Sequence, residues 1–453
     1  MRILIVQESL LDESPIICDF SAFLKSYGNE VFLLIQRSEK NFFGEIKKIS
    51  PDIIFIQAEI LGWNWARRIT REIKREFKEV KIGAFGSLPT FYMTDSNLDV
   101  DFLILGEPEL PALNLISYLS GEKADLRNIF LRSEDGKYIS YGFSPLEIDL
   151  NSLPLPDRKI YERYKLLTDF PVKRFIISRG CMLSCSFCYI SALKNVFGLR
   201  LRKKFPERAV QDVISVKEKY PLSFVHFSDD IFPVYDRRWL SDFCNMWKKE
   251  VKLPFSIFAI ASFINDDVAR ILKDAGCRLV IFGLETYNEE RRAGFLEKKG
   301  VSNSVIENAF GSLKKAGIYV GTTNIIGLPS EEIDDWFKTA EYNFALKTDL
   351  PLATKFTYIP HTKISSNSCF DWEAEEFRDI FPLCAGSKLF LNISKFVMRN
   401  NIDFLLPILK LFSLSYLSLK MKRIYSIRFL DGVKYLISAG LINQRTNVLN
   451  GLS

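Results

Sequence analysis

Histidine is the scarcest ionisable residue of this chain: 453 residues contain only His226 and His361, and neither belongs to a ligand pair. A tetrahedral zinc site takes four Cys or His ligands at short spacings, so the sequence argues against a zinc protein. The segment after Met1 lacks the cleavage site of a secretory signal, and the eight cysteines show no disulfide framework. We therefore expect an intracellular, cytoplasmic protein whose thiols stay reduced.

Repeats, low-complexity segments and long unbroken apolar runs are also absent from the sequence. The longest apolar stretch, Ile402–Leu419, is interrupted by Asp403, Pro407 and Lys410, so we expect no membrane-spanning helix. A length of 453 residues exceeds what one hydrophobic core usually organises, which predicts two or three domains.

Three cysteines lie close together in one polar loop, at Cys181, Cys185 and Cys188. A single free cysteine is commonly a small buried hydrophobic residue, but three in one polar loop favour a metal cluster. A [4Fe–4S] cluster normally takes four thiolates, which would leave one iron open here. The other five cysteines are isolated in the sequence: Cys18, Cys244, Cys277, Cys369 and Cys384.

The spacing Cys-x3-Cys-x2-Cys resembles the motif with which the radical S-adenosylmethionine (SAM) superfamily holds its [4Fe–4S] cluster. The resemblance implies that SAM binds the open iron of a cluster held by Cys181, Cys185 and Cys188. It also implies that Phe187 and Tyr189 shield the cluster and the adenine, although a plain core role for Tyr189 is the alternative.

The N-terminal region alternates short β-branched runs with amphipathic stretches, which predicts a parallel, doubly wound α/β sheet. In such sheets ligands bind at the carboxyl ends of the strands. Five strands are expected: residues 2–6, 30–35, 52–56, 80–85 and 101–105.

This Rossmann-like (flavodoxin-like) region, residues 1–125, resembles the cobalamin-binding domain that precedes many radical SAM cores. It contains no histidine, so the resemblance implies base-off binding without an imidazole ligand, and Ser87-Leu88 replaces the usual Gly-Pro. A domain that only supports the catalytic core is the alternative. The implied cobalamin contacts lie at the strand ends: Gln7, Glu8, Gly86, Ser87, Leu88, Pro89, Thr90, Gly106 and Glu107.

A proline-containing linker, residues 126–170, is expected to join this domain to a partial (β/α)6 barrel at residues 171–365. The cysteine loop follows the first barrel strand, at the end where such barrels place their chemistry. Six strands are expected: residues 174–178, 223–228, 255–259, 278–282, 319–326 and 352–358.

Polar motifs at later strand ends resemble the SAM-binding motifs of the same superfamily. Asp229 and Asp230 match the carboxylates that hold the SAM amino group, although a turn or helix cap is an equally good role for either alone. Glu285 is placed near the ribose or methionyl part, and the Ile326 region beside adenine. The third strand lacks the arginine that many relatives carry there.

The resemblance implies an enzyme that uses a [4Fe–4S] cluster, SAM and cobalamin to methylate an unactivated carbon. A radical SAM cyclase or carbon-skeleton rearrangement enzyme is one alternative, and a non-catalytic redox or cobalamin sensor is another. The implied partners are a small-molecule, apolar or lipid-like substrate and an electron donor such as flavodoxin or ferredoxin.

The positive charge of the chain is concentrated in the mainly helical C-terminal region, residues 366–453. Residues 385–453 carry ten Lys and Arg against Asp403 and Asp431, whereas residues 1–384 carry 51 against 53 acidic residues. We expect this region to cap the substrate cavity, with peripheral contact to an anionic membrane as the alternative. Nucleic acid is not an expected partner, because no recognition motif accompanies the charge.

Overall fold

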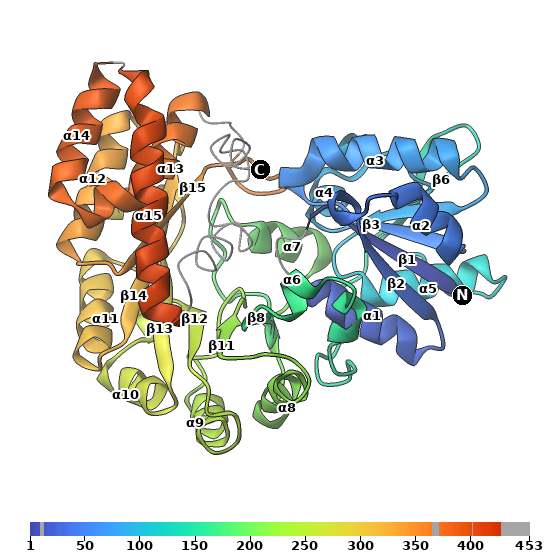
Figure 1. The fold of residues 1–453 in the computed structure, drawn as a ribbon, viewed down its shortest axis with the longest axis horizontal. Helices are drawn as coiled ribbons and strands as arrows, with labels where there is room; N and C mark the ends of the chain where they lie inside the picture. Colours follow the sequence, from blue (N-terminus) through green and yellow to red (C-terminus); the bar gives the residue numbers. More distant parts are fainter. Residues whose placement is uncertain (10–12, 365–370, 401, 427–453) are drawn as a thin grey trace.

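The computed structural model describes residues 1–453 except 10–12, 365–370, 401 and 427–453. Cys369, the boundary expected at 365/366 and the last 27 residues of the basic region therefore lie outside the described residues. Figure 1 shows an N-terminal α/β domain beside a second α/β domain, with the C-terminal helices on the far side of the second.

The N-terminal sheet has the strand order β2-β1-β3-β4-β5-β6-β7. Its first five strands are parallel, as expected, whereas β6 and β7 add an antiparallel hairpin from the segment expected as a linker. Both faces of β1 are buried, because Ile3 and Ile5 enter one apolar cluster and Leu4 and Val6 another. The strands are β1 Arg2–Gln7, β2 Glu30–Ile35, β3 Ile53–Gln57, β4 Lys81–Phe85, β5 Phe102–Ile104, β6 Ile129–Arg132 and β7 Tyr138–Ser140. The helices are α1 Pro15–Ser26, α2 Phe42–Ile49, α3 Trp63–Glu76, α4 Ser87–Tyr92 and α5 Glu109–Leu119.

The second sheet is an open, six-stranded parallel sheet of order β15-β14-β13-β12-β11-β8, which confirms the expected partial barrel. A short antiparallel ribbon, β9 with β10, lies beside the cysteine loop. The strands are β8 Val172–Phe175, β9 Ser178–Arg179, β10 Arg202–Lys203, β11 Phe224–Phe227, β12 Phe255–Ala259, β13 Cys277–Glu285, β14 Tyr319–Ile326 and β15 Leu350–Lys355. The helices are α7 Tyr189–Phe197, α8 Pro206–Lys217, α9 Arg237–Met246, α10 Asp266–Asp274, α11 Asn303–Lys315 and α12 Ile333–Ala345.

Alternate side chains of these strands face two different layers. Val225 and Phe227 of β11 pack in one apolar cluster with residues of α8 and α9, on the outside of the barrel. Phe224 of β11 and Leu279 of β13 face the opposite, inner side. Odd-numbered residues of β13 and β14 therefore point into the barrel.

Three C-terminal helices complete the fold: α13 Asp371–Gly386, α14 Lys388–Arg399 and α15 Leu406–Tyr425. The last turns of α15 pack against the inner side of the barrel through Leu417, Met421, Ile424 and Tyr425. The ring of Tyr425 lies 4.3 Å from that of Phe224, the first residue of β11. This helix therefore covers the inner face of the barrel near the amino ends of its strands.

The apolar stretch forms a continuous helix, and the expectation that it does not span a membrane stays a prediction. By length and composition only, the helical segment Asp403–Tyr425 is apolar enough to cross a membrane, with a mean hydropathy of 1.4. Pro407 does not break the helix because it occupies the first turn, where proline is tolerated. One such helix is weak evidence for a membrane span, since core helices of soluble proteins have the same composition.

A buried group of charges joins the two domains. Glu13 accepts from Arg158 at 2.6 Å and from Lys173 of β8 at 2.9 Å, and the three side chains are 2–6% exposed. Arg158 belongs to the short helix η4, Arg158–Tyr161, which precedes α6, Lys165–Thr168. Charges buried this deeply need partners, so Glu13 fixes the linker against the first barrel strand.

Candidate iron–sulfur and SAM site

The cysteine loop leaves the barrel through a turn that requires glycine. Gly180 has φ +95°, and a Cβ atom there would lie 2.9 Å from the carbonyl oxygen of Arg200. The loop then runs to Cys188, which is the N-cap residue of α7. Its three cysteines are therefore held between the ribbon β9–β10 and the first turn of α7.

The three thiols share one electrostatic environment. Burial, together with the charges of neighbouring cysteines, raises the pKa of Cys185 to about 11 and that of Cys188 to about 12. The ammonium of Lys298 acts in the opposite direction on Cys181 and Cys185. Buried thiols that would resist ionisation when free become thiolates when they bind metal.

The donor set of the loop consists of three thiols, which is the chemistry that a [4Fe–4S] cluster takes. Among the described residues, no three His, Cys, Asp or Glu side chains gather closely enough for one metal ion. Three thiols in one loop fit three corners of a [4Fe–4S] cube, whose ligands lie further apart than those of one ion.

Asp229 and Asp230 both contact the backbone that leads into the cysteine loop. Asp229 Oδ1 accepts from the amide of Ile177 at 2.8 Å and also from the amide and hydroxyl of Ser178, which fixes the turn. Burial raises the pKa of Asp229 to about 7, and its Oδ2 has no hydrogen-bond partner among the described residues. Asp230 accepts from the amide of Gly180 at 2.8 Å and from the hydroxyl of Tyr189. Both carboxylates thus hold the loop, and SAM binding by either stays a prediction.

Glu285 lies at the end of β13 in a left-handed conformation, with φ +67°. Its Oε1 accepts a hydrogen bond from Lys298 at 2.7 Å, and both side chains are 9% exposed. Lys298 could not be identified from the sequence, because no motif marks a lysine that lies 13 residues beyond its partner. A SAM contact for Glu285 also stays a prediction.

The inward side chain at the end of β14 belongs to Ile325 rather than Ile326. Ile325 and partly buried Phe187 share an apolar cluster with Phe356 and Ile364. Ile326 is fully buried in another cluster, against residues of α12 and α13. The two-residue period of β14 places Ile325 on the same side as Tyr319 at the start of the strand, and an adenine contact by the Ile326 region stays a prediction.

The strand-end loops of the N-terminal domain contact residues that flank the cysteine loop or follow β15. Tyr92 donates to the carbonyl oxygen of Tyr358 at 3.2 Å, and the rings of Phe91 and Tyr189 lie 6.2 Å apart. Glu107 pairs with Arg202 at 2.5 Å, and Arg179 lies 3.6 Å away.

The residues predicted to contact cobalamin divide into two groups. The residues of the first group are partly exposed at the strand-end loops, where a ligand could contact them. The residues of the second group are buried inside the domain, and their side chains would contact a ligand only if the loops moved. Ser87 is held by Glu59, and Gln7 accepts from Tyr161 at 2.7 Å. A cobalamin contact by either group stays a prediction. The first group is Glu8, Gly86, Ser87, Gly106 and Glu107, and the second is Gln7, Leu88, Pro89 and Thr90.

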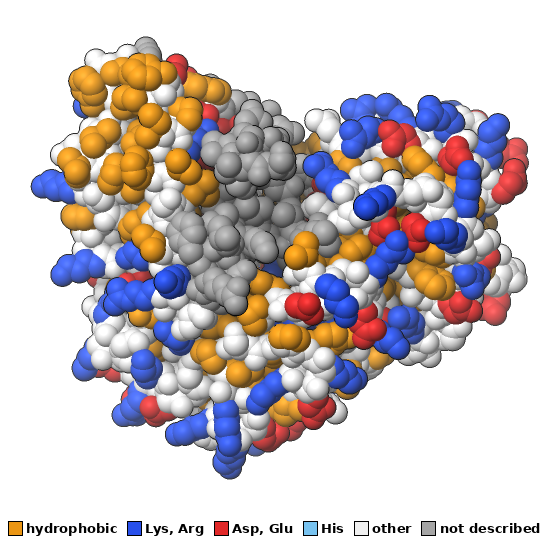
Figure 2. Space-filling model, in the orientation of Figure 1, with side chains coloured by type: hydrophobic (Ala, Val, Ile, Leu, Met, Phe, Trp, Pro, Cys, Tyr) orange, Lys and Arg blue, Asp and Glu red, His pale blue; other side chains and the backbone are white. Residues whose placement is uncertain are grey.

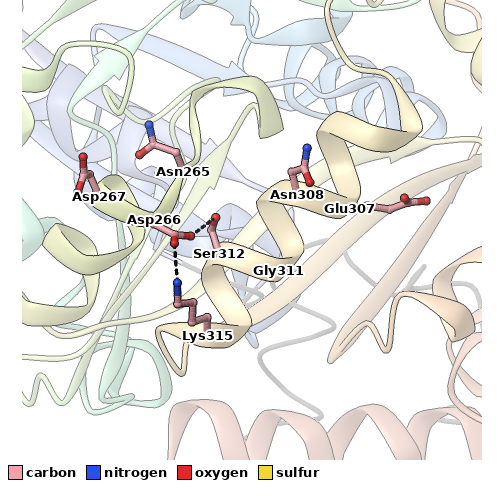
Figure 3. Close-up of a pocket in the computed structure, with 8 residues that line it drawn as sticks. All are labelled: Asn265, Asp266, Asp267, Glu307, Asn308, Gly311, Ser312 and Lys315. Atoms are coloured by element: carbon pink, nitrogen blue, oxygen red, sulfur yellow. Dashed lines mark hydrogen bonds and ion pairs between the residues drawn. The ribbon is translucent and has the colours of Figure 1, made fainter.

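A surface depression between α10 and α11 lies outside this site (Figure 3). Its lining includes Asp266, which accepts from Ser312 and Lys315 at 2.7 Å each. No residue of the cysteine loop lines it.

Residues 175–342 match the sequence profile of the Radical SAM superfamily. The chain contains a radical SAM domain. This finding confirms the family expected from the cysteine spacing and makes the protein a radical SAM enzyme, for which the family implies a [4Fe–4S] cluster and SAM.

Similar proteins extend the comparison beyond that domain. The radical SAM methyltransferase TsrM from Kitasatospora setae, solved with cobalamin and a [4Fe–4S] cluster, superposes with a TM-score of 0.64 at 16% identity, over 80% of this chain and 76% of that one. An uncharacterised methyltransferase of Pyrococcus horikoshii is 26% identical over 70% of both chains. Cytidylyl-2-hydroxyethylphosphonate methyltransferase of Streptomyces wedmorensis is 22% identical over 74% of this chain and 69% of its own. At these identities the structural likeness establishes the fold, including the N-terminal domain.

Proposed function

We propose that this protein is a cobalamin-dependent radical SAM methyltransferase that methylates an unactivated carbon of a small molecule. The proposal is supported by the three cysteines, by two methyltransferase relatives and by the shared two-domain fold of TsrM. When bound, the cluster with SAM supplies a 5′-deoxyadenosyl radical, and cobalamin supplies the methyl group.

The observation that carries the proposal is the contact of the N-terminal strand ends with residues that flank the cysteine loop. Tyr92, Phe91 and Glu107 each reach a residue of the barrel domain beside that loop or the end of β15. A ligand held at the partly exposed strand-end residues would therefore face the cluster and the mouth of the barrel.

The inner face of the barrel supports an apolar or lipid-like substrate. Phe258, Ile281 and Leu352 share one apolar cluster with the last turns of α15, so the amino end of the barrel is closed by hydrophobic side chains. His226 contributes no charge there at neutral pH, because burial lowers its pKa to about 3. Because α15 closes the amino end of the barrel, away from the cysteine loop, the cap over the substrate cavity expected of this region stays a prediction.

The outer faces of α14 and α15 support peripheral contact of this cytoplasmic enzyme with a membrane. Figure 2 shows a group of hydrophobic side chains over these helices, which we call the α14–α15 apolar surface. A patch of this size usually marks an interaction site, and nearby exposed Lys388 and Lys422 suit anionic headgroups. The surface consists of seven side chains that are more than half exposed: Leu389, Phe396, Phe404, Ile408, Leu411, Phe412 and Leu419.

Transfer of a deuterated methyl group tests the proposed reaction. The reconstituted protein would be incubated with deuteromethyl SAM, hydroxocobalamin, reduced flavodoxin and a small-molecule extract of its own cells. We expect the label in a small-molecule product extracted into organic solvent, together with 5′-deoxyadenosine. A cyclase or rearrangement enzyme would release 5′-deoxyadenosine and leave every product unlabelled, which would contradict methyl transfer.

A further inference from the structure

Lys298 is a lysine buried beside the cysteine loop. It is 8% exposed, and its ammonium donates to Glu285 Oε1 at 2.7 Å and to the carbonyl oxygen of Gly283 at 2.5 Å. Burying an ammonium group is costly unless it is paired and hydrogen-bonded, and here both conditions are met. The fold therefore maintains one positive and one negative charge at the end of β13.

The segment that carries Lys298 is bonded to the cysteine loop itself. It follows the π-helical turn η7, Arg291–Phe295. The amide of Ser186 donates to the carbonyl oxygen of Leu296 at 3.0 Å, and the Ser186 hydroxyl donates to that of Phe295 at 2.7 Å. Because Ser186 directly follows Cys185, the position of Lys298 relative to the thiols is fixed by hydrogen bonds.

Other charged groups also lie near the loop. Lys194 donates to the carbonyl oxygen of Leu183, inside the loop, at 2.7 Å, but it is partly exposed, so water screens its charge more than that of Lys298. Arg292 is fully buried and donates to the carbonyl oxygens of Thr286 and Val301. Asp230 binds Gly180 and Tyr189 on the other side of the loop.

We propose that Lys298 and Glu285 act as a positioned charge pair that sets the reduction potential of the cluster bound by Cys181, Cys185 and Cys188. Reduction adds one negative charge to the cluster. The nearby ammonium of Lys298 stabilises that charge and the Glu285 carboxylate opposes it, and both charges are screened little because both side chains are buried. The inference rests on the cluster of the proposed function and requires neither cobalamin nor substrate.

Removing the positive charge of Lys298 and the negative charge of Glu285 in separate variants distinguishes control of the reduction potential from a purely structural role. The reconstituted full-length protein would be titrated potentiometrically without SAM, and the reduced cluster would be counted by electron paramagnetic resonance. We expect Lys298→Gln to lower the potential and Glu285→Gln to raise it, each by at least a tenfold change in the reduction equilibrium, or about 59 mV. Lys298→Arg should stay near wild type.

Two further measurements keep the test decisive. Lys314→Gln, which removes a surface ion pair with Asp349, should leave the potential unchanged. Iron and sulfide contents equal to wild type show that each variant is folded. If Lys298→Gln does not fold, the potentials of the two single variants Lys298→Arg and Glu285→Gln decide the test. The proposal would be overturned if Lys298→Gln and Glu285→Gln shifted the reduction potential in the same direction, or if neither variant shifted it. Weaker SAM binding by Lys298→Gln at an unchanged potential would overturn it as well, in favour of a SAM contact. Either result would leave methyl transfer by the wild type untouched.

Discussion

Arg179 lies at the contact between the two domains and directly precedes the glycine turn of the cysteine loop. Its guanidinium lies 2.6 Å from Glu109 and 3.3 Å from Asp19, whose side chains are 0% and 5% exposed. Replacing it with methionine would leave two buried carboxylates without this cation. Breaking a buried pair by removing one partner typically costs about 3–5 kcal/mol, whereas an exposed pair contributes about 0–1 kcal/mol. We therefore expect Arg179→Met to lower the free energy of unfolding by about 3–5 kcal/mol.

Urea denaturation of the cluster-free protein, followed by tryptophan fluorescence, measures this loss. Glu109→Gln should cost less, because Arg179 keeps Asp19 and Glu107, and the double variant should lose less than the sum of the two single variants. Arg127→Met is a matched control, since the pair of Arg127 with Asp125 is exposed and contributes little. A loss below about 1 kcal/mol for Arg179→Met would refute the reasoning, because it would place these carboxylates in a solvated environment.

Three further predictions follow from the site and the C-terminal helices. Replacing Cys181, Cys185 and Cys188 with alanine should abolish cluster incorporation, and iron and sulfide contents equal to wild type would exclude these ligands. Because folding raises the pKa of Asp229 from 3.8 to about 7, the folded state binds more protons between these values, and its stability should fall as pH rises through this range. Between pH 5 and pH 8, the free energy of unfolding of the cluster-free protein should fall less in Asp229→Asn than in wild type, by up to about a few kcal/mol. An equal fall in the variant would show that other groups cause the pH dependence. Replacing Phe404, Ile408 and Leu411 with glutamine should reduce sedimentation with anionic vesicles at low salt, whereas glutamine at Leu61, which is 80% exposed in the N-terminal domain, should not. Equal sedimentation of both variants and wild type would reject the α14–α15 apolar surface as the membrane contact.

Sequence patterns predicted most of the backbone, because burial imposes a clear period on the strands. All five expected N-terminal strands and all six barrel strands are present within a few residues of their expected bounds. The hairpin β6–β7 was missed because it is short and half exposed at the edge of the sheet, where burial imposes only a weak pattern.

The charge pairs of the site could not be predicted, because they depend on which loops meet in space. Arg179 finds carboxylates 70 and 160 residues away, and Lys298 reaches back to Glu285 across a π-helical turn. The C-terminal apolar stretch stays helical despite Pro407, because the proline falls in the first turn of α15, a position that the sequence pattern does not mark. By contrast, the cysteine spacing is a local signal, and the family it indicates was confirmed.

The absorption spectrum of the anaerobically purified and reconstituted protein, recorded with and without hydroxocobalamin and desalted before measurement, tests the cofactor content most directly. The proposed function predicts a broad iron–sulfur absorption band that Cys185→Ala abolishes, together with corrinoid bands that persist in that variant, because the two cofactors bind different domains. An iron–sulfur spectrum without any retained corrinoid would contradict a cobalamin-dependent enzyme and leave the N-terminal domain a support for the barrel.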